Sequence, residues 1–140
     1  MIPAKNNKKG VPMKGFTILV LSLFACSALA LGCKKGIAVD CATKMRDVKV
    51  EKKDVGSSFM VKCPAACSAG SVYGVDTYTT DSSVCLAAVH AGVIKADKGG
   101  AVKVTVVKGL DKYEGSDKNG VKSSEWKTSW GDTAFTVSDK

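Results

Sequence analysis

Four cysteines between positions 41 and 85 constrain the fold of this 140-residue chain more than any other feature. They are Cys41, Cys63, Cys67 and Cys85, and an even number of cysteines in an exported chain predicts disulfides. Two disulfides are therefore expected, and the residues alone leave their pairing open. A Cys-x3-Cys pair with a single distant histidine lacks a second pair of metal ligands, so we predict neither a metal site nor a cofactor.

The first 32 residues have the composition of a signal peptide. They contain four lysines and no acidic residue, and an uncharged stretch runs from Gly15 to Cys33. A basic start followed by an apolar run is typical of an export signal. Because Met13 alone would begin a conventional signal, the sequence leaves the natural start open between Met1 and Met13. We expect an extracytoplasmic protein, in the periplasm or at the cell surface.

The apolar run ends in LALGC, which resembles the bacterial lipobox. This resemblance implies that the Cys33 thiol is acylated, that the chain is cut before it, and that the mature protein is anchored to the envelope membrane. Two alternatives stay open. Cys26 is a weaker second lipobox, and the uncharged stretch is also long enough to span a bilayer without cleavage.

The sequence therefore divides into a lipoprotein-type signal peptide over 1–32, a short tether over 33–40 and one domain over 41–140. Without residues 1–32 the chain has 17 basic and 13 acidic residues. Part of the excess lies in 44–53, where five basic residues outnumber two acidic ones, as in a solvated strand face or linker. Such a segment weakly favours anionic surfaces. With no arginine-rich stripe or aromatic platform beside it, nucleic-acid binding has little support.

Hydrophobic periodicity predicts several strands and one helix. The helix is expected over 83–91, capped by Asp81 or Ser82 and stopped by Gly92, and it is buried because it is apolar on every side. Gly74 is expected at a bend, and Asn119-Gly120 at a hairpin turn. Together these elements predict an α+β domain, a small antiparallel β-sheet curled around one central buried α-helix and stapled by disulfides. Strands are expected at 48–55, where the register is unclear, and at 57–63, 70–80, 99–109 and 132–139.

Three stretches, in this order, resemble the LCCL domain: CPAAC at 63–67, CLAAVHAG at 85–92 and YEGSDKNG at 113–120. The resemblance covers residues 60–137. It departs from the family pattern at Ala66, where glycine usually precedes the third cysteine, and at Tyr73, where tryptophan is common.

The LCCL resemblance implies an extracellular, non-enzymatic module with a β-sheet curled around a central helix. It also implies disulfides that join the first cysteine to the second and the third to the fourth, Cys41 to Cys63 and Cys67 to Cys85. Members of the family have been linked to lipopolysaccharide, glycan or matrix binding, and this implies a binding role.

The only histidine, His90, lies in a stretch that also contains serines, an aspartate and Cys85, the ingredients of nucleophilic catalysis. In a helix, Ser83 and His90 are about 10 Å apart along the axis, and Cys85 and His90 face different directions. We therefore predict that His90 is structural, together with Gly92 at the end of the helix, and that the protein is not an enzyme. A hydrolase that uses His90 is the less favoured alternative.

Two tryptophans and several lysines are the remaining candidates for function. We expect Trp130 in the core, because a small domain with few aromatic residues needs them there, and we treat Trp126 as a candidate ligand contact. Lys49, Lys52, Lys53 and Lys127 are candidate contacts for an anionic ligand. The predicted function is a non-enzymatic, lipid-anchored binding module for a glycan, lipopolysaccharide or another envelope ligand. The alternative is a structural envelope protein with a protein partner.

Overall fold

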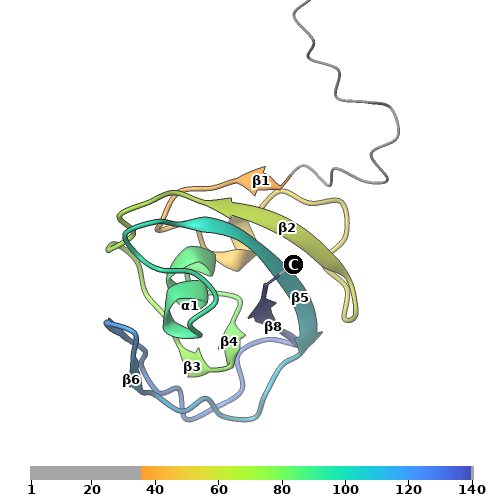
Figure 1. Cartoon of the computed structure of the whole chain (residues 1–140). Helices are drawn as coiled ribbons and strands as arrows, with labels where there is room; N and C mark the ends of the chain where they lie inside the picture. Colours follow the sequence, from red (N-terminus) through yellow and green to blue (C-terminus); the bar gives the residue numbers. More distant parts are fainter. Residues whose placement is uncertain (1–35, 140) are drawn as a thin grey trace, which may run out of the picture. The chain divides into compact units, whose positions relative to one another are not determined.

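The structure, a computed structural model, describes residues 36–139. The predicted signal peptide and the acylation candidates Cys33 and Cys26 lie outside this range. Within it, a six-stranded sheet curls around one short α-helix, and a small hairpin lies apart from the sheet (Figure 1). The predicted α+β class, with a curled sheet around a central helix, is confirmed.

The sheet has the strand order β1-β2-β5-β8-β4-β3, and every neighbouring pair is antiparallel except β1 and β2. The longest strand, β5, runs between β2 and β8 and arches over the helix (Figure 1). The strands are β1 (Ile37–Ala38), β2 (Ser58–Cys63), β3 (Gly74–Val75), β4 (Thr77–Thr79), β5 (Gly100–Lys108) and β8 (Thr133–Ser138).

Alternation along β5 decides which face of the sheet is buried. Val102, Val104 and Val106 are fully buried on one face, whereas Lys103 is exposed on the other. Because side chains alternate along a strand, the valines face the helix and Lys103 faces solvent. The same alternation continues across the register, in which Val106 pairs with the buried Phe135 of β8.

The helix α1 (Val84–His90) is buried at all seven positions, as its apolar circumference predicts. Its predicted capping is wrong. Ser83 is the N-cap residue and makes no side-chain capping bond, while Asp81 binds two cations and the Ser82 hydroxyl accepts the Tyr73 N–H at 2.9 Å. These polar groups are used to fix the loop before the helix, so they are not available to the helix terminus.

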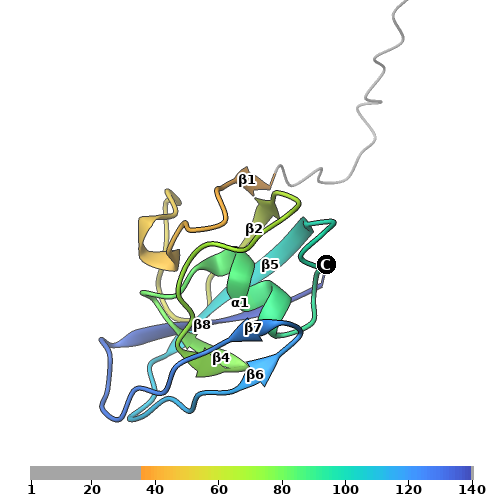
Figure 2. The ribbon, with the colours of Figure 1, turned by 90° about the vertical axis from the view of Figure 1, so that its left-hand side faces the viewer.

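The C-terminal end of α1 is fixed by a hairpin, β6 (Asp117–Lys118) and β7 (Val121–Lys122). Asn119 and Gly120 have φ of 53° and 77°, which confirms the predicted turn. The Asn119 side-chain amide donates to the His90 carbonyl oxygen at 3.0 Å. Gly92, with φ of 78°, ends the helix as predicted. Figure 2 shows the hairpin beside this end of the helix.

Two expectations near the start of the domain are wrong. Residues 48–55 form no strand: Val48 directly follows the 3-10 helix η1 (Met45–Asp47), and the buried Met45 and Val48 side chains anchor a loop. The expected tether is also partly structured. Ile37 and Ala38 form β1, and Ile37 packs against the core.

The disulfides join Cys41 to Cys67 and Cys63 to Cys85, so the pairing that the resemblance implied is wrong. Cys63 continues the inward face of β2 set by Val61, and this face is turned toward the first turn of α1, which contains Cys85. The chain then reverses after Pro64, and Cys67 meets the loop at Cys41. A single strand therefore directs Cys63 to the helix, and the next turn directs Cys67 away from it.

Candidate ligand-binding site

A surface pocket of about 140 Å³ is lined by Tyr73, Thr79, Asp81, Trp126 and Trp130. The ring centroids of Trp126 and Trp130 are 5.1 Å apart at an interplanar angle of 83°, and those of Tyr73 and Trp126 are 6.1 Å apart at 79°. Edge-to-face packing of this kind holds aromatic rings in fixed orientations. The pocket therefore presents ordered aromatic surfaces beside one carboxylate.

Three separate parts of the chain supply the pocket. Tyr73 precedes β3 and forms an isolated bridge to Ser124, and Thr79 ends β4. Trp126 is fixed by two backbone hydrogen bonds to the buried Tyr113, at 2.7 and 2.8 Å. The pocket is thus held by backbone pairing on both of its sides.

Only one of the two tryptophans lies where the sequence predicts it. Trp126 is 37% exposed, in keeping with its candidacy as a ligand contact. Trp130 is only partly buried and lines the pocket, so its predicted place in the core is wrong. The reason is that the chain is outside the six-stranded sheet between Lys108 and Thr133, and Tyr78 and Phe135 already fill aromatic positions of the core.

Asp81 connects the pocket to the basic segment 44–53. Its Oδ1 atom lies 2.8 Å from Lys44 Nζ and 2.9 Å from an Arg46 guanidinium nitrogen, and its side chain is 19% exposed. Two cations therefore share one carboxylate at the pocket wall. Arg46 remains half exposed and also lines an open depression of about 500 Å³ with Lys49 and Lys53.

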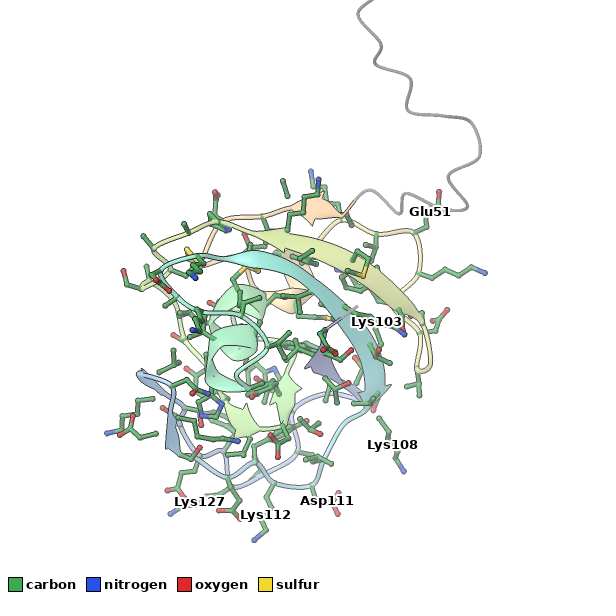
Figure 3. All side chains as sticks on the ribbon, in the orientation of Figure 1. Glu51, Lys103, Lys108, Asp111, Lys112 and Lys127 are labelled. Carbon is green, nitrogen blue, oxygen red and sulfur yellow. A yellow bond between two sulfur atoms is a disulfide. The ribbon has the colours of Figure 1, made fainter. Side chains whose placement is uncertain are left out.

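The four predicted lysines do not form one patch. Lys49 and Lys52 are exposed, but the Lys53 ammonium donates to the Arg46 carbonyl oxygen. Lys127 is exposed and lies 3.5 Å from Glu125. Figure 3 shows Glu51, which belongs to the basic segment, and Lys127 at opposite ends of the domain.

His90 is fully buried and bound at both ring nitrogens. Its Nδ1 lies 2.9 Å from the Tyr78 hydroxyl, and its Nε2 lies 3.0 Å from Ser116 Oγ and 3.3 Å from the Ser116 carbonyl oxygen. Because a carbonyl only accepts, this geometry fits a proton on Nε2 and an Nδ1 that accepts from Tyr78. Neither nitrogen contacts Ser83 or Cys85, so the side chains of a nucleophilic pair are not assembled.

Burial raises the pKa of Tyr78 to about 12, an effect that the nearby Asp76 charge adds to and its backbone hydrogen bond reduces. The hydroxyl therefore stays protonated over the physiological range and can serve as the donor to His90.

In residues 36–139, no three or more His, Cys, Asp or Glu side chains are grouped so that they could hold a metal ion. The same part of the chain contains no helix with the length and apolar character needed to cross a membrane.

A family model of the LCCL domain matches residues 39–133. The chain belongs to the LCCL domain family. Clotting factor C of Tachypleus tridentatus is 45% identical over 92 residues, which cover 64% of this chain and 9% of that protein. Human cochlin is 40% identical over 99 residues, 67% of this chain and 17% of cochlin, and human vitrin is 48% identical over 79 residues, 55% of this chain and 11% of vitrin. The chain thus spans less than a fifth of each of these relatives.

Most residues of the aromatic pocket cannot be predicted from the sequence. From the sequence, Tyr73 is a departure from the family pattern, Asp81 is a candidate cap, and nothing distinguishes Thr79. These residues approach Trp126 only through the sheet and its loops, so sequence spacing holds no signal for them. The closely spaced tryptophans in a polar stretch were the one usable clue.

Proposed function

We propose that the protein is a non-enzymatic binding module of the cell envelope, and that its LCCL domain binds an anionic glycan such as lipopolysaccharide. The observation that carries this proposal is the uneven charge of the domain. Residues 36–139 contain 14 lysines and arginines and 13 carboxylates, yet segment 44–53 alone has five cations and two carboxylates. The attraction for an anion is therefore local to this segment.

Other features support a binding role outside the cytoplasm. Two disulfides are typical of an oxidising compartment, where the predicted signal peptide would deliver the chain. Catalysis has little structural support, because the Cys85 thiol is consumed in a disulfide and both nitrogens of His90 are engaged by Tyr78 and Ser116.

A binding assay tests the proposal. The full chain, produced by export so that its disulfides form, is titrated with lipopolysaccharide, an acidic polysaccharide and a neutral polysaccharide. We expect the two anionic ligands to bind and the neutral one to bind far less, and binding to weaken as salt screens exposed charges. Charge reversal at the exposed Lys49 and Lys52 should weaken binding several-fold without lowering the melting temperature. Lys103→Glu, on the outer face of β5, is the control and should change neither binding nor the melting temperature.

Three outcomes would contradict this function. If neutral and anionic polysaccharides bind with equal affinity, binding does not depend on the charge of the ligand. If the chain binds an envelope protein and none of the polysaccharides, the alternative of a structural envelope protein is favoured. A hydrolytic activity that His90→Ala abolishes without loss of stability would favour an enzyme.

We further propose that Cys33 is acylated and holds the domain at the membrane. Cys33→Ser should then prevent lipid labelling and leave an unprocessed precursor, which the intact mass of the purified protein reveals. Continued labelling of this variant would indicate that Cys26 is the acylated residue. A wild-type mass without lipid would contradict the lipid anchor.

A further inference from the structure

We propose that the aromatic pocket holds one sugar ring of the glycan, and that Arg46 pairs with a carboxylate or phosphate on that ring. This inference rests on the proposed function and deepens it, because it assigns the contact to residues outside the predicted lysine set.

The pocket lining suits a sugar ring. The C–H face of a pyranose is apolar and its edge carries hydroxyls, so it needs an aromatic surface and a nearby polar acceptor. Trp126 and Trp130 supply two indoles nearly at right angles, and Tyr73 also packs edge-to-face with Trp126. Asp81 supplies the acceptor. Both ion pairs of Asp81 use Oδ1, so in the described part of the chain Oδ2 is the oxygen available to a ring hydroxyl.

The charges at the pocket favour an anionic ring over a cation. A cluster of aromatic rings with a carboxylate also resembles sites for quaternary ammonium groups. Here, however, Lys44 and Arg46 both lie within 3 Å of Asp81 Oδ1, at 2.8 and 2.9 Å. A bound cation would meet two positive charges against one negative charge, whereas an anionic ring would be attracted.

The size of the pocket limits what enters it. Pockets for drug-sized ligands measure about 300–1,000 Å³, and this one measures about 140 Å³. It accommodates one ring rather than an oligosaccharide. The larger depression is lined by Arg46, Lys49 and Lys53, and Arg46 connects it to the pocket through its ion pair with Asp81. It offers a basic surface for the adjoining units of the same glycan.

Intrinsic fluorescence provides a direct test, because Trp126 and Trp130 are the only two tryptophans of the chain. The full chain is titrated with an oligogalacturonide, with its neutral galactose counterpart, with lipopolysaccharide, and with anionic phospholipid vesicles that contain no sugar. We expect a saturable change in tryptophan emission with the oligogalacturonide and lipopolysaccharide, a smaller affinity for the neutral sugar, and no change with the vesicles. A response to only one of the two anionic ligands identifies whether the charged ring is a carboxylated or a phosphorylated sugar.

Variants separate the pocket from the rest of the surface. Trp130→Ala should weaken oligogalacturonide binding about two- to ten-fold, the range expected for loss of one aromatic contact, and Trp130→Phe should recover part of it. Arg46→Ala should weaken binding of the acidic ligand and leave binding of the neutral one unchanged. Lys103→Ala is the matched control for Arg46→Ala, and the melting temperature of each variant reports folding.

The outcomes distinguish the inference from the proposed function. If anionic glycans bind without a change in emission, and Trp130→Ala binds as the wild type does, the pocket assignment is wrong and the function stands. If no anionic glycan binds the full chain, both are wrong. An equal affinity for the acidic and neutral oligosaccharides would overturn the role of Arg46.

Discussion

Ala66 has φ of 58°, a backbone conformation that glycine adopts more easily than alanine. The alanine at this position therefore carries backbone strain that a glycine would not. We expect Ala66→Gly to stabilise the domain by about 1 kcal/mol, because relief of the strain exceeds the added entropy of the unfolded chain. Thermal unfolding with the disulfides intact measures this. Ala65→Gly is the control: Ala65 has a negative φ, so this change should destabilise. If both changes shift the free energy of unfolding equally, the backbone at Ala66 is not strained.

His90 connects α1 to two other parts of the domain through Tyr78 and Ser116. Its replacement by alanine leaves the buried Tyr78 hydroxyl and the half-buried Ser116 without this partner, at about 1–3 kcal/mol for the buried group, and adds a cavity. We expect His90→Ala to lower the free energy of unfolding by several kcal/mol in urea titrations, whereas the exposed Lys122→Ala should change it little. Wild-type stability of His90→Ala would show that these contacts do not hold the helix.

Tyr78 gives the domain a pH dependence in the alkaline range. Its pKa in the folded domain is about 12, and that of an unfolded tyrosine is about 10. Below pH 10 both states keep the proton, and between pH 10 and 12 only the folded state keeps it, so stability falls as pH rises through this window. Urea unfolding at a series of pH values should show a shallower decline for Tyr78→Phe than for the wild type. Identical slopes would contradict the raised pKa.

At the scale of elements, the two disulfides connect different parts of the fold. Peptide mapping under non-reducing conditions should find Cys41 linked to Cys67 and Cys63 linked to Cys85. Each loop spans more than 20 residues, so loss of either bridge is expected to cost about 3 kcal/mol. Removal of the second bridge should cost more, because Cys85 is fully buried in α1 and Cys63 belongs to β2, whereas Cys41 is partly exposed. A peptide that links Cys67 to Cys85 would contradict this topology.

The elements also show where sequence reasoning succeeds. Strong alternation at 99–109 and the all-apolar run at 83–91 predict β5 and α1, because one face or one whole element must be buried. The pattern at 48–55 looks similar, but its first valine anchors a loop and Val55 is 58% exposed. Local periodicity cannot distinguish these cases, since the neighbouring strand decides them. The disulfide pairing that the family resemblance implied is wrong, because the pairing depends on which face of β2 Cys63 occupies relative to α1.

In the domain as a whole, the proposed binding surface combines features that are distant in sequence. Asp81, a predicted helix cap, lines the pocket beside Trp126 and binds two cations of the predicted basic segment. Segments more than 40 residues apart therefore form one aromatic and basic surface, whereas the charged side chain on the outer face of β5 is Lys103 (Figure 3). We therefore predict that a glycan binds at one defined place on the domain.

A nuclear magnetic resonance titration of the isotope-labelled full chain with an oligogalacturonide tests that claim most directly. We predict that the largest shifts occur at the indole N–H signals of Trp126 and Trp130 and at the amides of Asp81 and Arg46, while the amide of Lys103 stays unchanged. Shifts confined to the outer face of the sheet, or a bound glycan that leaves both indole signals in place, would contradict it.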